Sequence, residues 1–258
     1  MRAAFENPHF LVHAVMKTGV HPQLVGNYVV ANAPLSFVEQ NNLMALVSEI
    51  SSRGEADSVF SDADTSAKIA IAHHALLTSL SAHLDLAPIR LGAVYAGKEA
   101  VKAMLKASAL DFSLALETIA GAAEFAMKLT PVEGFVQAPV IAPVVSGRSY
   151  LQRRSVAAAE QRTEGERTRS AASDIFMSVS SAARAHVFAP PRRNATADAE
   201  KRLLDAALLV SRDTMEAFKN TVVAAQERAI AQGFQLSVTG PLPPYSFVVP
   251  SERTGVGV

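Results

Sequence analysis

The residues closest in type and spacing to a catalytic motif are Gly92-Ala93-Val94-Tyr95-Ala96-Gly97-Lys98-Glu99. Their glycines and lysine have the spacing of a P-loop, in which backbone N–H groups and the lysine hold nucleotide phosphates. Glu99, however, stands where a Ser or Thr hydroxyl must bind magnesium, and its carboxylate would repel the phosphates. Val94 and Tyr95 are also typical of a strand. We therefore interpret the segment as a strand-to-helix turn, with a nucleotide-binding enzyme as the less favoured alternative.

The other side chains that could carry chemistry do not form a recognisable set. His73 and His74 are adjacent on a predicted helix, so they point to different sides and cannot share a metal, and no HExxH motif is present. The chain has no cysteine, which excludes disulfides and thiolate chemistry. It also lacks the Gly-x-Ser-x-Gly motif of a nucleophile elbow. We predict no cofactor, no metal site and no enzymatic activity.

The charge balance argues against several classes of partner. Lys plus Arg equals Asp plus Glu, at 24 each, so the formal net charge of the 258 residues is zero. A neutral chain has no overall attraction for nucleic acid or for an anionic membrane. Residues 18–38 carry no charged side chain, but glycines, asparagines and prolines divide them into short pieces, which predicts strands and loops. With no cysteine and no visible secretion signal, we expect a cytoplasmic protein.

The first 130 residues mix strand and helix patterns without a regular βαβ repeat. The predicted strands cover 10–16, 26–30, 43–50, 86–95 and 124–129. The predicted helices cover 64–84, a stretch from 97, and 109–121. This mixture predicts an α+β fold whose N-terminal mixed α/β domain spans residues 1–130. Residues 131–146 hold three prolines among apolar residues, which forbids a helix and predicts an apolar, proline-containing linker.

Residues 147–258 are predicted to form a second domain. Residues 147–186 are helical in composition, strands follow at 186–189 and 203–210, and Asp213 and Glu216 suit a capping box for the next helix. Gly233 suits the end of that helix, and residues 234–239 alternate as a strand. This order is close to a ferredoxin-like split βαβ arrangement. A ferredoxin-like RNA- or ligand-binding module is therefore an alternative, although the strands lack the basic and aromatic pattern of RNA-binding sheets.

The chain ends in a stiff, aromatic segment, residues 240–248, which we call the arm. Pro241, Pro243 and Pro244 fix their own φ angles and keep the preceding residues extended. Tyr245 and Phe247 then supply two aromatic anchors. Two interpretations stay open: the arm is a strap packed on the second domain that can also reach the linker or first domain, or it docks on a partner.

Four stretches resemble gas vesicle proteins F and L. The arm resembles their Gly-Pro-Trp-Pro-Pro-Tyr-x-Phe signature, with Leu242 in place of the tryptophan. Residues 87–95 resemble a Leu-Pro-Val-Arg-Phe-Gly-Thr-Val-Phe strand, and 117–128 a Gly-x-x-Glu-Trp-x-Val-Lys segment with Phe125 for tryptophan. Residues 147–151 match a Gly-Arg-x-Tyr-Leu helix start. Substitution between large apolar residues preserves packing better than contacts that need indole.

The resemblance implies an assembly or minor structural protein of gas vesicles, located in the cytoplasm at the vesicle. Its partners would be the small hydrophobic shell protein and other gas vesicle accessory proteins, and the choice between an F-like and an L-like member stays open. We expect Arg90 and Glu124 to lie at strand ends or to pair with opposite charges and so stabilise the fold. The candidate partner-binding or structural residues are Arg90, Glu124, Lys128, Gly147, Arg148, Tyr150, Leu151, Gly240, Pro241, Pro243, Pro244, Tyr245 and Phe247.

Overall fold

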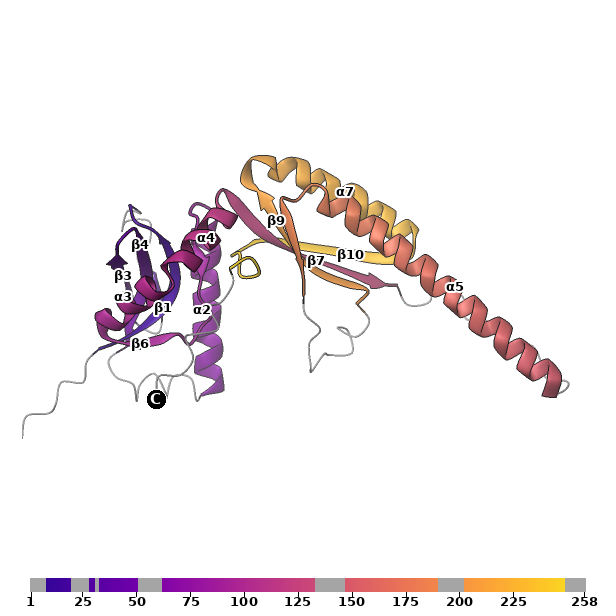
Figure 1. The fold of residues 1–258 in the computed structure, drawn as a ribbon, viewed down its shortest axis with the longest axis horizontal. Helices are drawn as coiled ribbons and strands as arrows, with labels where there is room; N and C mark the ends of the chain where they lie inside the picture. The colour runs from indigo at the N-terminus through magenta and orange to yellow at the C-terminus, as the bar shows by residue number, and fades with distance from the viewer. Residues whose placement is uncertain are drawn as a thin grey trace, which may run out of the picture. The chain divides into compact units, whose positions relative to one another are not determined.

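The computed structural model describes residues 8–19, 28–30, 33–50, 62–132, 147–189 and 202–248 (Figure 1). The chain divides into two compact units. Unit 1 comprises Met1–Glu124 together with Pro241–Val258, and unit 2 comprises Phe125–Gly240. Each unit has its own sheet, and the second unit lies within the span of the first along the sequence.

The sheet of unit 1 has the strand order β2-β3-β4-β1-β5, and β6 also pairs with β1. Its strands are β1 (His9–Lys17), β2 (Val29–Val30), β3 (Ala33–Gln40), β4 (Leu43–Ile50), β5 (Ala87–Pro88) and β6 (Val94–Ala96). The central strands β1 and β4 are buried along almost their whole length. Burial on both faces explains why they are nearly continuous apolar runs.

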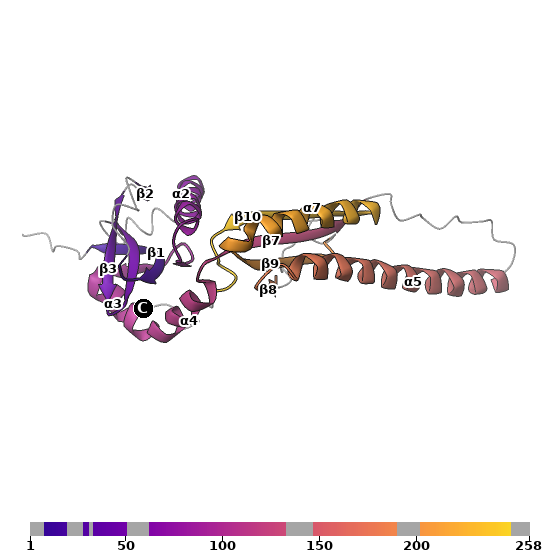
Figure 2. The same ribbon diagram turned by 90° about the horizontal axis from the view of Figure 1, so that it is seen from above.

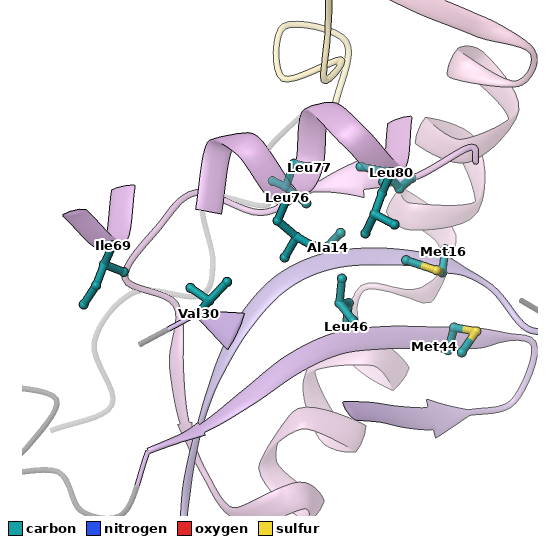
Figure 3. Packing of buried hydrophobic residues seen from close by; sticks show 10 residues of the cluster. Ala14, Met16, Val30, Met44, Leu46, Ile69, Leu76, Leu77 and Leu80 are labelled. Carbon is teal, nitrogen blue, oxygen red and sulfur yellow. The ribbon is translucent and has the colours of Figure 1, made fainter. Parts of the chain in front are cut away.

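Three helices cover the sheet of unit 1: α2 (Ala63–Ser81), α3 (Gly97–Ala107) and α4 (Ala109–Ile119). Asp62 caps α2, because its Oδ2 accepts a hydrogen bond of 2.8 Å from the Thr65 N–H. Leu76, Leu77 and Leu80 of α2 point toward the side chains of β1 and β4 (Figure 3). Helix α3 lies over the opposite face (Figures 1 and 2). The core of unit 1 is therefore formed on both sides of β1 and β4.

Unit 2 has the element order β7 (Ala122–Pro131), α5 (Gly147–Ser180), β8 (Ala185–Phe188), β9 (Leu204–Ser211), α7 (Met215–Ala231) and β10 (Phe234–Leu242). This is the β-α-β-β-α-β order of a split βαβ motif. The strands lie in the order β10-β7-β9-β8, and α5 and α7 pack side by side over one face (Figure 2). The Phe125 ring packs on Phe218 of α7, with centroids 4.9 Å apart.

Several predicted elements are confirmed and others are wrong. The strand at residues 43–50 and the helices that begin at Gly97 and Ala109 are confirmed. The single strand predicted for 86–95 is wrong, since β5 and β6 are separate and Gly92 between them turns the chain with a φ of +101°. Strand β3 was not predicted. Its proline, Pro34, and its partly exposed residues hide the strand pattern.

The second half needs three corrections. The strand predicted to close the first domain is β7, which belongs to the second sheet. The helix from 147 ends at Ser180 instead of His186, which lies in β8. The capping box of Asp213 and Glu216 is wrong, because residues 212–214 form a 3-10 turn and no side chain caps α7. Residues 133–146 of the predicted linker lie outside the described residues.

Candidate functional site

Three of the buried polar side chains that the structure describes in unit 1 lie together in its core. They are His13 of β1, Ser48 of β4 and His73 of α2, and their exposed fractions are 0%, 0% and 3%. The pairing of β1 with β4 shifts by one residue between Val12 and Ala14, which makes His13 the extra residue of a β-bulge. A bulge redirects the side chain of its extra residue. Here His13 is directed toward Ser48 and His73.

These side chains form one hydrogen-bonded line that reaches the arm. The Ser48 Oγ lies 3.0 Å from the His13 Nε2, and the Nδ1 atoms of His13 and His73 are 2.9 Å apart. The His73 Nε2 lies 3.3 Å from the Tyr245 hydroxyl. In neutral imidazoles one ring nitrogen donates and the other accepts. All donors in the line must therefore point the same way, either from Ser48 toward Tyr245 or from Tyr245 toward Ser48.

The Ser48–His13 contact resembles the nucleophile and base of a hydrolase, but its surroundings do not suit that chemistry. Ser48 lies within a central strand and is fully buried, so a substrate has no access to its hydroxyl. Burial, together with the neighbouring His73, lowers the pKa of His13 to about 3. An imidazole with that pKa is a poor base at neutral pH. The line is therefore structural.

A second contact holds the arm through Glu124 at the start of β7. The Ser246 N–H donates to Glu124 Oε2 at 2.8 Å, and the Ser246 hydroxyl donates to Oε1 at 2.8 Å. Burial raises the pKa of Glu124, while the two hydrogen bonds from Ser246 oppose that rise. Burial also raises the pKa of Tyr245 to about 12, helped by the negative charge of Glu124. One buried carboxylate thus holds two donors of a single arm residue.

The arm differs from its prediction in where it packs. We expected it mainly against the second domain, but Tyr245 and Ser246 bond to His73 and Glu124, which are residues of unit 1. Phe247 is buried, and Tyr245 packs against the apolar cluster between α2 and the sheet. The prediction failed because sequence proximity to β10 does not determine where a segment beyond the strand docks. Of the two places expected for Glu124, a strand end or a pair with an opposite charge, the structure shows the first, near the start of β7, where Ser246 donates to its carboxylate.

The remaining predicted site residues are dispersed. Arg90 is exposed just after β5, Lys128 is half-buried on β7, and Gly240 and Pro241 are exposed on β10. Pro243 and Pro244 are buried. Residues Gly147, Arg148, Tyr150 and Leu151 begin α5, and their side chains lie outside the described residues.

Sequence reasoning missed His13, Ser48 and Ser246 as site residues. For the first two a signal existed, since each is a polar residue inside an otherwise apolar strand run. Such residues need hydrogen-bond partners when buried. The partners themselves carry no local signal, because His13 and His73 are 60 residues apart.

The P-loop-like segment contains regular secondary structure. Val94–Ala96 form β6, paired with β1, and Gly97 starts α3 with a φ of +82°. The Glu99 Oε1 forms an ion pair with the Lys102 Nζ, and the two atoms are 2.8 Å apart. The predicted strand-to-helix turn is confirmed. Within the described part of the chain, no cluster of three or more His, Cys, Asp or Glu could hold a metal ion.

Unit 2 carries an apolar surface at the edge of its sheet, which we call the β8 surface. The name covers three exposed residues, Met177 of α5 and Val187 and Phe188 of β8, together with the buried Phe176 on which Phe188 packs. Val187 and Phe188 point to opposite faces of β8, which is the last strand in the described order. The Phe176 ring lies 5.0 Å from those of both His186 and Phe188. Met177 and Phe188 are 60% and 54% exposed. Large apolar side chains gathered on a surface often mark a protein contact.

The comparisons with known proteins agree with one another. The chain is 28% identical over 249 residues to gas vesicle protein L of Streptomyces sp. (strain CB03234), covering 92% of this chain and 91% of that protein. The crystal structure of gas vesicle protein GvpF from Anabaena sp. PCC7120 superposes with a TM-score of 0.69 at 16% identity, covering 95% and 97% of the two chains. The crystal structure of GvpF from Microcystis aeruginosa superposes with a TM-score of 0.67 at 14% identity, covering 93% of this chain and 99% of that chain.

The two-sheet mixed α/β fold is thus the fold of the solved GvpF proteins. The family described as gas vesicle synthesis protein GvpL/GvpF matches residues 10–249, and this chain belongs to that family. The resemblance found in its sequence motifs is confirmed, and membership implies a role in gas vesicle formation. Among the helices that the structure describes, none has a stretch apolar enough to span a bilayer.

Proposed function

We propose that the protein binds the small hydrophobic shell protein of gas vesicles during assembly, and that the β8 surface is the contact. Family membership supports the role, and the exposure of Phe188 and Met177 supports the place. A subunit that builds an apolar shell exposes apolar surface before it is assembled. An assembly protein with an apolar sheet edge of its own can cover the exposed apolar surface of the shell subunit. Other accessory proteins of the vesicle would bind the resulting complex.

The edge position of β8 supports strand addition as the mode of binding. β8 pairs with β9 along Ala185–Phe188, and no described strand lies beyond it. A strand at a sheet edge offers backbone N–H and C=O groups to an extended segment, while side chains next to it provide specificity. Phe188 and Met177 would contact the apolar side chains of that segment. An edge of this kind suits an extended, hydrophobic partner.

The arm fits a different role, because its anchors are already occupied. Phe247 is buried and Tyr245 is half-buried in unit 1, with the hydrogen bond to His73 described above. Binding a partner through these side chains would first require breaking those contacts. We therefore assign the arm to the stability of unit 1 and the β8 surface to the shell protein.

Co-expression with the small shell protein tests this proposal. A tagged full-length chain should capture the shell protein, and Phe188→Ser combined with Met177→Ser should reduce capture at least tenfold. Leu110→Ser is the matched control, since Leu110 is 72% exposed on α4 of unit 1 and should leave capture unchanged. Equal capture by the β8 variant and the wild type would place the contact elsewhere. Normal vesicle number and shape in a strain that lacks this gene would remove the assembly role itself.

A further inference from the structure

The two buried histidines contact each other through identical atoms. Their Nδ1 atoms are 2.9 Å apart, and only one hydrogen fits between two nitrogens at that distance. When both rings are neutral, one Nδ1–H donates and the other Nδ1 accepts. The outer nitrogens then contact the Ser48 Oγ and the Tyr245 hydroxyl. The neutral pair therefore satisfies its hydrogen bonds without charge.

Added protons disturb this arrangement in two steps. A first added proton binds the free Nε2, so that both Nε2 atoms donate outward while one hydrogen stays between the Nδ1 atoms, but a positive charge is then buried. A second proton places an N–H on each Nδ1, so that two donors face each other at 2.9 Å. Neither ring can turn away without losing its bond to Ser48 or Tyr245. The doubly protonated pair is incompatible with this geometry.

The four segments around the pair differ in how easily they can move. His13 and Ser48 belong to the central strands of the sheet, and His73 lies within α2. Tyr245 belongs to the part of the arm that follows β10 and lies in no helix or strand. We propose that the His13–His73 pair is a proton-controlled latch, which holds the arm on unit 1 when neutral and releases it when protonated.

The charged and titratable groups near the pair act in opposite directions. Burial lowers the pKa of His73, and the neighbouring His74 on α2 lowers it further, so both oppose protonation of His73 while the arm is closed. His73 is the histidine that contacts the arm, so relief of its burial lets it bind a proton more readily once the arm has left. Burial raises the pKa of Glu124 on β7, which therefore favours the closed arm as the pH falls. Acid thus acts on the arm through His73 and in the opposite direction through Glu124, and release at low pH requires that His73 outweighs Glu124.

A single tryptophan can report the position of the arm. The chain contains no tryptophan, so Phe247→Trp in the full-length protein gives a unique fluorophore at a buried arm position. Acrylamide quenching then measures its access to solvent from pH 7.5 to 4.5, while far-UV circular dichroism follows the sheets and helices. We expect quenching to rise as the pH falls while the dichroism is unchanged. The released fraction should rise about tenfold per pH unit for each proton bound on release.

Three further substitutions in the Phe247→Trp chain identify the groups responsible. His73→Gln should lose at least half of the pH dependence, because one titrating ring and the facing N–H pair are gone. His83→Gln is the control, since His83 is exposed just after α2 and is not among the groups that shift the pKa of His13 or His73, and it should retain the dependence. Glu124→Gln should make quenching depend more steeply on pH, because it removes the protonation of Glu124, which opposes release of the arm.

Three results would overturn the latch. The first is quenching that stays constant across the pH range, and the second is a His73→Gln chain with the wild-type slope. The third is release that coincides with loss of the dichroism signal, which would be unfolding of the whole unit. If Phe247→Trp does not fold, amide hydrogen exchange of residues 243–248 in the unsubstituted chain replaces the quenching measurement. The exchange rates are corrected for the intrinsic rate at each pH. The same three results would then overturn the latch.

Discussion

The molecule uses aromatic residues in two contrasting ways. In the arm, Tyr245 and Phe247 are packed into unit 1, and the neighbouring Ser246 is hydrogen-bonded to Glu124. On the β8 surface, Phe176 is buried, but Phe188 and Met177 beside it are exposed. Both regions have the composition of a binding site. Only the second leaves its apolar area accessible.

The contrast shows that aromatic composition alone does not define an interface. The arm's aromatic residues come with partners inside the same unit, including a buried histidine and a buried carboxylate. On the β8 surface the Phe188 ring lies 5.0 Å from that of Phe176, yet Phe188 stays 54% exposed. Changes in the arm should therefore alter stability, and changes on the β8 surface should alter binding.

Removal of the arm should have the largest effect. A chain that ends after Leu242 loses Tyr245, Phe247 and Val248, and leaves the Glu124 carboxylate without its two donors. Burial of each aromatic side chain contributes about 2 kcal/mol, so we expect unit 1 to lose about 4 kcal/mol. Urea denaturation of the truncated and full chains measures the difference. An unchanged midpoint would mean that the arm is a passive tail.

Acid should lower the free energy of unfolding by a smaller amount. The pKa of His13 is 6.5 in the unfolded chain and about 3 in the native protein. Below pH 6.5 His13 is therefore protonated in the unfolded chain and stays neutral in the native one. This contribution is complete above pH 6.5 and is lost progressively as the pH falls. Between pH 6.5 and 5 the loss should be about 2 kcal/mol, from a slope of about 1.4 kcal/mol per pH unit.

Urea denaturation at a series of pH values measures this loss. Glu124, whose pKa is raised, stabilises the native state at acid pH and reduces the slope. Replacing the exposed His83 by Gln provides the control and should leave the slope unchanged. A free energy of unfolding that is constant from pH 7 to 5 would contradict the burial of a neutral His13.

Local patterns explain which parts of the fold the sequence could predict. Strand β4 begins with an unbroken apolar run, residues 43–47. Gly121 and Gly233 each come just after a helix and have a positive φ. The signals for these features therefore lie within a few residues. The place of β7 depends on pairing with strands that come much later in the chain. Periodicity identifies such a strand but does not identify the sheet to which it belongs.

The site was harder to predict for the same reason. His13 and Ser48 meet across two strands and His73 approaches from a helix, with sequence separations of 35 and 60 residues. The extra residue that redirects His13 exists only in the register of β1 against β4. Glu124 and Ser246 are 122 residues apart. The sequence identified Glu124 and Tyr245 through their motifs, but not their partners.

Substitution on the β8 surface should separate binding from stability. Phe188→Ser removes an exposed apolar side chain, so the free energy of unfolding should change by no more than about 0.5 kcal/mol. Affinity for the shell protein should fall about tenfold, equivalent to about 1.4 kcal/mol. Ile230→Ser on α7 is the matched control, since Ile230 is also exposed and lies outside the β8 surface. A large drop in stability would show that Phe188 serves the core of unit 2.

The smallest expected effect isolates a single hydrogen bond of the arm. Tyr245→Phe keeps the ring in the apolar cluster and removes only the hydroxyl that contacts the His73 Nε2 at 3.3 Å. Such a hydrogen bond contributes about 1 kcal/mol to the free energy of unfolding. Because the distance is long for a hydrogen bond, we expect a loss of no more than that amount. The Tyr245 hydroxyl helps to determine which ring nitrogens of His73 and His13 carry a hydrogen. Without it, the two tautomers of each ring can exchange, so Tyr245→Phe should also change the ring NMR signals of both histidines. Unchanged stability together with unchanged histidine signals would mean that the arm is held by packing and Glu124 alone.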